Sequence, residues 1–404
     1  MQSKNSLLSI LKYTSLSLAL SIVVSCSKED NQIIPVQVND YLVESIYRDD
    51  VSKSVISMTA QLAGYPQFSS YLHYSIKLYV ITYRTTYKGE PIIASGIISL
   101  PITSDSMPMM LVGNGLIFAD EDAPSRFDLP NHFTGFEFIA SIGYITLIPD
   151  MIGFGISRDQ LFPIQNYEHS ANSMIDFLFA CEEFIKEKNI PTSQKKFLTG
   201  YSQGGYIAMA TLKKIEEHPE LDIKIDATAV GAGGFNLVNL LNYSLDKNYY
   251  SAPSHLALLL SSYNIVYDWN RPLIDFFQEP YASEIPYLID GGYNREEIDQ
   301  QLAYSFDSLL NPVFLHNLKN NREERLMDAL TENSVDNWVP KGTLRIIHSI
   351  NDDRIPISDS EDMYNQMVSK GSESVTFTKI ETVGHIESGL AFVEIALQWF
   401  NTMK

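Results

Sequence analysis

The fold of this chain is decided by the stretch Gly200-Tyr201-Ser202-Gln203-Gly204-Gly205. It follows a strand-like run at 195–199 and leads into a run with helical spacing from Tyr206. A serine on a tight turn from strand to helix projects its hydroxyl, and glycines two positions before and after it leave room for the backbone. The pattern therefore predicts a nucleophilic Ser202 at the carboxyl end of a strand.

Around this turn, short β-rich runs alternate with helical runs from Met109 onward. Strands are expected at 109–112, 143–149, 196–200, 223–230, 343–349 and 374–380, and helices near 168–188, 203–217, 358–369 and 387–402. Such alternation requires crossovers between parallel strands, so we expect an α/β fold with a mostly parallel sheet and helices on both faces. Ligands of such sheets bind at the carboxyl ends of the strands.

The sequence before this region is different in character. Residues 40–62 are expected to be helical, and residues 74–100 to form a β-hairpin. The hairpin prediction rests on two β-branched runs that flank the turn Lys88-Gly89-Glu90-Pro91.

The alternation stops between Gly234 and Thr343, where no buried strand is evident and aromatic residues are dense. We interpret 236–335 as a helical cap over the sheet, because an insertion of this length between consecutive strands is usually functional. The remaining segments, 40–235 and 336–404, would form the core. The alternative is a helical subdomain whose aromatic residues only fill its own interior.

A serine hydroxyl becomes a good nucleophile only when a base accepts its proton and an acid orients that base. His385 is the candidate base, because it lies between a late strand and the final helix in Thr382-Val383-Gly384-His385-Ile386. The other downstream histidines fit less well, since they lie at a helix end, in the cap or inside a strand: His218, His255, His316 and His348.

The candidate acid lies in the loop after the strand at 343–349. Asp352 has the D-x-x-I-P placement, with Ile355 and Pro356 following it. Asp353 is the alternative, because neighbouring acids at a strand end can exchange roles. Either carboxylate could also be an ordinary loop residue paired with Arg354.

These residues resemble the α/β-hydrolase superfamily over about Tyr74 to Phe400, and within it bacterial secreted esterases and secretory lipases. The resemblance is carried by the elbow, by the run 149–157 (Pro-Asp-Met-Ile-Gly-Phe-Gly-Ile-Ser), and by Tyr83-Arg84-Thr85 with Gly89 and Ser99-Leu100-Pro101. It implies an α/β-hydrolase fold and hydrolysis of carboxylic esters through an acyl-enzyme on Ser202. It implies no metal and no organic cofactor.

The resemblance also implies two backbone donors for the developing oxyanion. One is the amide of Gln203, directly after the nucleophile, and the other is assigned to Leu116 in the loop that follows the strand at 109–112. Asn114-Gly115 stands where many relatives have His-Gly, which is a departure from the family pattern.

Two other functions remain open at this point. The same catalytic constellation could cleave peptides, as in prolyl peptidases, although no repeated propeller blades precede it. A surface protein could instead have kept the fold for binding, with the tyrosine-rich cap stacking on sugars or acyl chains.

The first residues predict export. Lys4 and Lys12 precede an apolar stretch, 16–24, which is too short for a spanning helix of about 20 residues. The run Val23-Val24-Ser25-Cys26 resembles a lipobox, which implies a signal peptide at 1–25, a lipid on Cys26 and a polar tether at 26–39. The acidic residues after it resemble a surface-export signal, so we expect an enzyme anchored to the outer membrane or cell surface. An ordinary signal peptide with an incidental cysteine is the alternative.

The composition limits the partners. The chain has 49 acidic and 29 basic residues and a formal net charge of −20. Nucleic-acid binding depends on Lys and Arg, so a nucleic-acid partner is not expected. The acidic composition and the tyrosine-rich cap favour a neutral substrate, such as an acylated carbohydrate or a lipid ester. Cys181 lies on an apolar helical stripe and is expected in the core.

Overall fold

The computed structural model describes residues 40–62, 66–128, 135 and 138–404. The predicted signal peptide 1–25, the lipidation site Cys26 and the tether up to residue 39 lie outside the described residues. Within the described part of the chain, no helix has the length and hydropathy needed to cross a membrane.

The described residues contain a sheet of nine strands in the order β1-β2-β3-β5-β4-β6-β7-β8-β9. The strands are β1 (Leu42–Val51), β2 (Ile76–Tyr87), β3 (Glu90–Pro101), β4 (Met107–Gly113), β5 (Ile145–Pro149), β6 (Thr192–Tyr201), β7 (Ala227–Gly231), β8 (Leu344–Asn351) and β9 (Val375–Val383). The pairings from β5 through β9 are parallel, and those among β1, β2, β3 and β5 are antiparallel. The predicted α/β fold with a mostly parallel sheet is confirmed, and so is the hairpin at 88–91.

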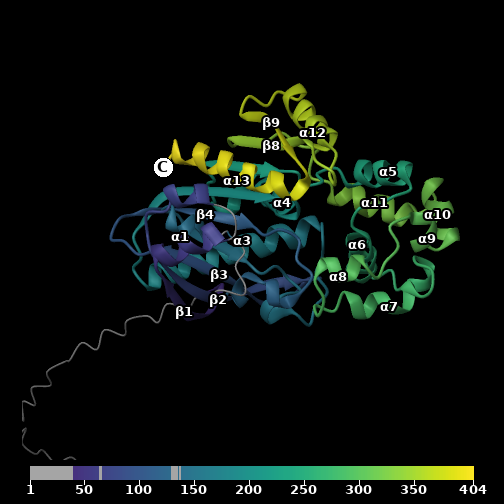
Figure 1. Ribbon diagram of the computed structural model, residues 1–404, viewed down its shortest axis with the longest axis horizontal. Helices are drawn as coiled ribbons and strands as arrows, with labels where there is room; N and C mark the ends of the chain where they lie inside the picture. The colour runs from purple at the N-terminus through teal and green to yellow at the C-terminus, as the bar shows by residue number, and fades with distance from the viewer. Residues whose placement is uncertain (1–39, 63–65, 129–134, 136–137) are drawn as a thin grey trace, which may run out of the picture. The chain divides into compact units, whose positions relative to one another are not determined.

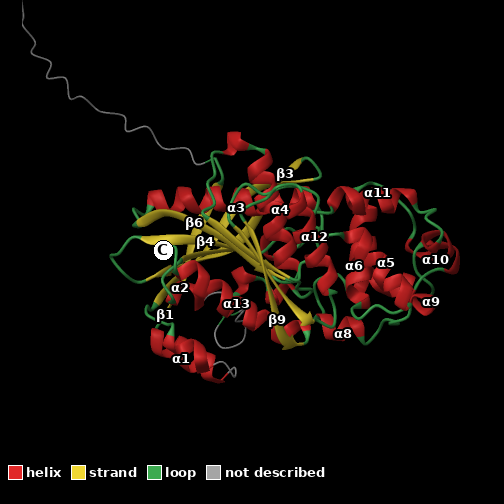
Figure 2. Cartoon of the chain, turned by 90° about the horizontal axis from the view of Figure 1, so that it is seen from above, coloured by secondary structure: helices red, strands yellow, loops and turns green. Residues whose placement is uncertain are grey.

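Helices cover both faces of this sheet, as Figure 2 shows. One face carries α3 (Tyr167–Glu187), α4 (Gln203–Glu217) and α12 (Ile357–Ser369), and the other carries α1 (Lys53–Leu62), α2 (Phe138–Ser141) and α13 (His385–Asn401). Each helix buries an apolar stripe against the β-branched and aromatic side chains of the strands. The parallel strands β4, β6, β7 and β8 therefore end together, between the two helical layers.

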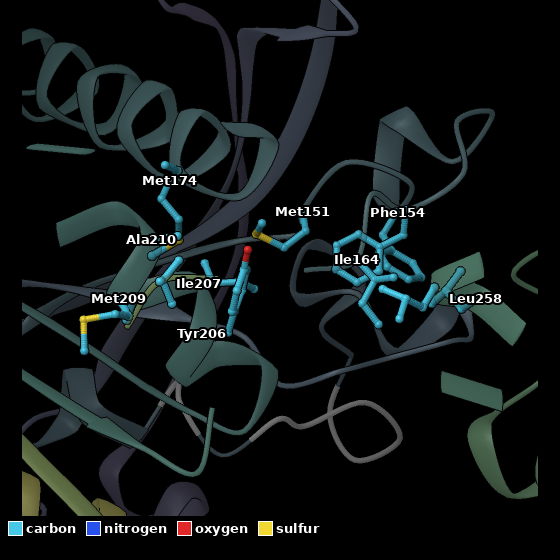
Figure 3. Close-up of a cluster of buried hydrophobic side chains, with 14 of the residues drawn as sticks. Met151, Phe154, Ile164, Met174, Tyr206, Ile207, Met209, Ala210 and Leu258 are labelled. Atoms are coloured by element: carbon cyan, nitrogen blue, oxygen red, sulfur yellow. The ribbon is translucent and has the colours of Figure 1, made fainter. Parts of the chain in front are cut away.

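The interior under α3 and α4 is one continuous apolar cluster. Figure 3 shows part of it, where Met174 of α3 and Ile207 and Ala210 of α4 lie close to Met151. Cys181 belongs to the same cluster and is fully buried. Burial raises the pKa of its thiol well above the ordinary value, as expected for a core cysteine.

The prediction of a helix over 40–62 is wrong in its first half. Residues Leu42–Val51 form β1, which pairs antiparallel with β2, and the helix α1 begins only at Lys53. β1 is an edge strand whose residues are mostly exposed and half of them polar, so it lacks the apolar alternation of a half-buried strand. The start of β1 is held by a residue distant in the sequence, because the carboxylate of Glu183 accepts the backbone N–H of Leu42 at 2.6 Å.

The segment between β7 and β8 is helical, and its helices lie together beside the sheet (Figure 1). They are α5 (Leu237–Lys247), α6 (Pro253–Val266), α7 (Tyr281–Leu288), α8 (Arg295–Asp299), α9 (Phe306–Leu309), α10 (Pro312–Lys319) and α11 (Glu324–Asn333). Tyrosine hydroxyls join these helices to the rest of the fold. The hydroxyl of Tyr206 in α4 lies 2.7 Å from the carbonyl oxygen of Asn333 and 3.0 Å from that of Gln165, and Tyr263 of α6 donates to the same Gln165 oxygen at 2.9 Å.

Candidate active site

Ser202 lies on the turn between β6 and α4 in a backbone conformation that L-residues rarely adopt. Its φ and ψ are 56° and −131°. The flanking glycines are required sterically: a Cβ on Gly200 would lie 2.0 Å from the carbonyl oxygen of Gly204, and one on Gly204 would lie 2.1 Å from that of Gly113. The turn predicted from the glycine spacing is therefore present, and it holds the serine side chain out from the end of β6.

His385 and Asp352 come from later connections and meet this serine. His385 is the first residue of α13, and its Nε2 lies 2.7 Å from Oγ of Ser202. Its Nδ1 lies 2.8 Å from Oδ2 of Asp352, in the loop after β8. The three side chains thus form a continuous hydrogen-bonded chain, although 183 residues separate Ser202 from His385. This order of contacts suits transfer of the serine proton to the imidazole.

The carboxylate of Asp352 is fully buried and well supplied with donors. Its Oδ1 accepts the backbone N–H groups of Arg354 and Ile355, each at 2.9 Å. Burial raises the pKa of Asp352, but its contacts with His348 and His385 lower it more, so this pKa lies well below the ordinary range. The residue is therefore an anion at neutral pH and can stabilise a protonated His385.

Asp353 has a different position from its neighbour. Its Oδ1 accepts the backbone N–H of His385 at 2.8 Å, so it contacts the start of α13. The hydroxyl of Tyr201 donates to the carbonyl oxygen of His385, also at 2.8 Å. The backbone of His385 is thus held from two sides while its ring faces Asp352 and Ser202.

His348 was not expected at this site. It is a fully buried residue of β8 whose Nε2 lies 3.4 Å from Oδ2 of Asp352, and its Nδ1 lies 2.8 Å from Oγ of Ser360. The sequence pattern placed it correctly inside a strand, and it was passed over as the base. A signal for this contact was available in the sequence, because His348 lies four residues before Asp352, near the end of the strand that leads to it.

The loop after β4 lies against the start of α4. The carbonyl oxygens of Gly113 and Asn114 would be 2.1 and 3.0 Å from a Cβ on Gly204, and Leu116 lines the same cavity as Ser202 and Gln203. Gln203 is the first residue of α4, so its N–H has no acceptor within the helix. The two residues predicted to stabilise the oxyanion therefore border the space in front of the serine.

The serine opens into a cavity of about 840 Å³. One wall of the lining is apolar and includes side chains from α2 and α13 and their neighbours, namely Phe127, Ile139, Ile142, Leu390, Val393 and Leu397. A second wall comes from the segment between β7 and β8 and is aromatic and polar, with Tyr243, Lys247, Tyr249, Tyr250, His255 and Arg295. Such a cavity is large enough for a small molecule with one apolar and one polar half.

No group of three or more His, Cys, Asp or Glu side chains is arranged to hold a metal ion in the ranges that the structure describes. A buried carboxylate, an imidazole, a strained serine and the amides at a helix start are the groups needed for acyl transfer.

Comparison with known proteins identifies the family and the fold. Residues 138–403 match the secretory lipase family. A structure of a candidate hydrolase from Legionella pneumophila superposes with a TM-score of 0.79 at 24% identity, covering 90% of this chain and 98% of that one. The rice cell wall degrading esterase LipA from Xanthomonas oryzae gives a TM-score of 0.77 at 22% identity, covering 88% and 95%.

Candida antarctica lipase A in its closed state gives a TM-score of 0.63 at 16% identity, covering 86% of this chain and 78% of that one. No curated protein matches the chain at comparable significance. The name of the matched family indicates secretion, in agreement with the export predicted from the first residues. The family match spans most of this chain, and the strands and helices around Ser202 form an α/β-hydrolase fold. The chain therefore belongs to the secretory lipase family and is a carboxylic ester hydrolase.

Proposed function

We propose that Ser202 is the nucleophile of this esterase, that His385 is its general base and that Asp352 orients and stabilises the imidazole. The observation that carries the proposal is the unbroken contact from Ser202 Oγ to His385 Nε2 at 2.7 Å and from His385 Nδ1 to Asp352 Oδ2 at 2.8 Å. His385 takes the serine proton as Oγ attacks the ester carbonyl, and it returns that proton to the departing alcohol. A water molecule, activated by the same imidazole, then releases the acid from Ser202.

The backbone N–H groups of Gln203 and Leu116 are the proposed donors to the oxyanion. Gln203 supplies the amide at the start of α4, where the helix dipole also favours negative charge. Leu116 supplies the second amide from the loop after β4, which is held close by the contact between Gly113 and Gly204. Loss of one such donor costs about 10² to 10³ in kcat.

The direct test replaces the nucleophile. Ser202→Ala should lower kcat on 4-nitrophenyl butyrate by roughly 10⁶-fold and abolish labelling by a fluorophosphonate probe. The exposed Ser369, at the end of α12, gives a matched control in Ser369→Ala, which should react like the wild type. Unchanged turnover or labelling in Ser202→Ala would assign the nucleophile to another residue.

The two walls of the cavity suggest how an ester is oriented. We assign the acyl chain to the apolar wall of α2 and α13 and the alcohol half to the cap wall, whose tyrosines can stack on a sugar ring. An acylated carbohydrate or a lipid ester fits this division. The similar esterase from Xanthomonas oryzae is named as a cell wall degrading enzyme, which supports a carbohydrate-linked ester as substrate.

We further propose that the cap comprises 236–335, inserted into a core of 40–235 and 336–404. Support comes from the run of helices α5–α11 between the consecutive strands β7 and β8. Limited proteolysis tests this division: cuts at the cap boundaries should leave the core fragments associated and abolish hydrolysis, whereas cuts only within the core would argue against it.

The proposed location is the outer membrane, with a lipid on Cys26 after removal of 1–25. The lipobox-like run before Cys26 supports this proposal. Expression with a labelled fatty acid should label the wild type and not Cys26→Ala, and Cys181→Ala is the matched control because Cys181 is buried in the core. Label retained in Cys26→Ala would overturn the anchor.

A further inference from the structure

The residues that line the active-site cavity are less acidic than the chain as a whole. Acidic residues outnumber basic ones 49 to 29 in the whole chain. The ionisable residues that line the cavity include three cations, Lys247, Arg295 and Arg354, and only two carboxylates, Asp122 and Asp353. One of these carboxylates, Asp353, already accepts the N–H of His385. A site for a wholly neutral substrate would have no need of this excess of positive charge.

Two of the cations are guanidinium groups from different parts of the fold. Arg354 lies in the loop of Asp352, and its backbone N–H donates to that carboxylate at 2.9 Å. Arg295 is the first residue of α8, the cap helix that adjoins the core in Figures 1 and 2. Both side chains line the same cavity, so the core and the cap each supply one guanidinium.

These two groups are only partly neutralised. Nε of Arg295 lies 3.3 Å from Oδ2 of Asp299, whereas Arg354 forms no ion pair within 4.0 Å with any residue that the structure describes. Burial and the charge of Arg295 lower the pKa of Arg354, whereas Asp353, Asp352 and Asp299 raise it, so this guanidinium lies among charges of both signs. Because both guanidinium groups line one cavity, an anion bound there would pair with both.

The other residues of 236–335 that line the cavity include no carboxylate. His255 is buried with its Nδ1 2.9 Å from the hydroxyl of Tyr250, and burial together with the charge of Arg295 lowers the pKa of His255 to about 4. It is therefore neutral at pH 7. Lys247, on the cap wall, places its Nζ 3.9 Å from the ring centroid of Tyr243 and adds positive charge toward the solvent side.

We infer that the alcohol half of the substrate carries a carboxylate, which Arg354 and Arg295 bind together. This inference rests on the proposed function, since it assigns the alcohol half to the cap wall and the acyl half to the apolar wall. A guanidinium group presents two parallel N–H donors to a carboxylate, and a lysine would not match that geometry. The substrate class is thus an acyl ester of a hydroxy acid or of an acidic sugar.

The acidic composition of the chain led to the expectation of a neutral substrate. That expectation holds only if the charges are spread evenly, whereas the cavity lining has a larger share of cations than the whole chain. Negative charge elsewhere on the surface would slow the approach of an anionic ester, and the cations around the cavity would offset this locally.

The experiment compares 3-acetoxybenzoate with its methyl ester, which differ in one negative charge on the alcohol half. Wild-type enzyme should hydrolyse the carboxylate with a kcat/KM about tenfold higher, mainly through a lower KM. Arg354→Gln should reduce this preference about tenfold, and Arg354→Lys should retain part of it. Arg295→Gln should reduce it as well, which keeps the test decisive if one variant folds poorly. Arg325→Gln, at an exposed position of α11 outside the cavity, should leave the preference as in the wild type.

The possible failures are distinguishable. If both esters are hydrolysed, Ser202→Ala abolishes both reactions and the wild type shows no preference for the carboxylate, the inference is overturned while the proposed nucleophile stands. A preference that survives in both Arg354→Gln and Arg295→Gln overturns it equally. If Ser202→Ala hydrolyses both esters as fast as the wild type, the proposed function itself fails.

Discussion

Nε2 of His348 lies 3.4 Å from Oδ2 of Asp352, the same oxygen that lies 2.8 Å from Nδ1 of His385. One carboxylate oxygen is therefore shared by two imidazoles. The more distant one is fixed in β8 by its contact with Ser360. We interpret His348 as a positioning residue, which acts on the reaction only through Asp352.

Replacing His348 should reduce turnover without removing it. His348→Phe keeps the volume and loses both polar contacts, so kcat on 4-nitrophenyl butyrate should fall about tenfold, while His348→Gln should keep more of the activity. The pKa of Asp352 is lower in the folded protein than in the unfolded chain, so the ionised carboxylate stabilises the fold at pH values above the unfolded pKa. This stabilisation is lost as the pH falls below that value. In His348→Phe this contribution should shrink, which acid titration of the unfolding free energy can measure. Equal kcat in His348→Phe and the wild type would argue against the role.

The two neighbouring acids should differ sharply in importance. Asp352→Asn loses the anion that faces the imidazole, and kcat should fall by about 10⁴-fold, as when the acid of a serine triad is replaced. Asp353→Asn keeps an oxygen that can accept the N–H of His385, so its kcat should fall less than about tenfold. Steady-state kinetics on one aryl ester separates the two, and a larger loss in Asp353→Asn would exchange their roles.

Backbone strain at the proposed nucleophile, Ser202, should be measurable as a difference in the free energy of unfolding. Ser202 has a φ of 56°, which glycine adopts readily. Ser202→Gly should therefore unfold with a free energy about 1 kcal/mol higher than that of Ser202→Ala, and both variants should be inactive. Gly200→Ala should lose more than about 3 kcal/mol, because its Cβ would lie 2.0 Å from the carbonyl oxygen of Gly204. Equal stabilities for the two Ser202 variants in urea unfolding would contradict the strain.

Asp359 should make the enzyme less stable as the pH rises from 4 to 7. Its buried carboxylate accepts the N–H groups of Phe235 and Asn236, which precede α5. Burial raises the pKa of Asp359 to about 6, although these hydrogen bonds lower it in part. A raised pKa gives a contribution that is present below the unfolded pKa and lost as the pH passes 6. The change is on the order of 2 kcal/mol, and Asp359→Asn should remove it from the pH profile of the unfolding free energy.

Filling the apolar wall should shorten the preferred acyl chain. Leu390 of α13 is half-buried and lines the cavity, so Leu390→Trp reduces the space beside Ser202. Hydrolysis of 4-nitrophenyl decanoate should fall at least tenfold, and that of the acetate should change by less than about threefold. A parallel loss on both esters would mean that the acyl chain lies elsewhere.

Local chemistry explains which parts of the fold could be predicted. The strands β4, β5 and β7 are buried along their whole length, so their apolar runs are nearly continuous, and the helices between the strands have clear apolar stripes. β1 has neither feature, because its residues face solvent and its register depends on β2 and Glu183. Long-range pairing of that kind leaves no trace in a single segment of sequence.

The residues of the candidate site also differ in whether the sequence could indicate them. Ser202 and His385 could be proposed because glycines at fixed spacing and the strand–helix order restrict where a nucleophile and a base can lie. The contact of His348 with Asp352, and the presence of Arg295 and Arg354 in one cavity, depend on how the chain folds in three dimensions. Arg295 and Arg354 are 59 positions apart in the sequence, and only the tertiary fold places both in the cavity lining.

The hydrogen bond from the hydroxyl of Tyr201 to the carbonyl oxygen of His385 links the end of β6 to the start of α13. Tyr201 precedes Ser202 directly, so this hydrogen bond couples the strand that leads to Ser202 with the helix that begins at His385. In the proposed mechanism, sequence changes in 236–335 would then alter which esters are accepted while the pairing of Ser202 with His385 is preserved.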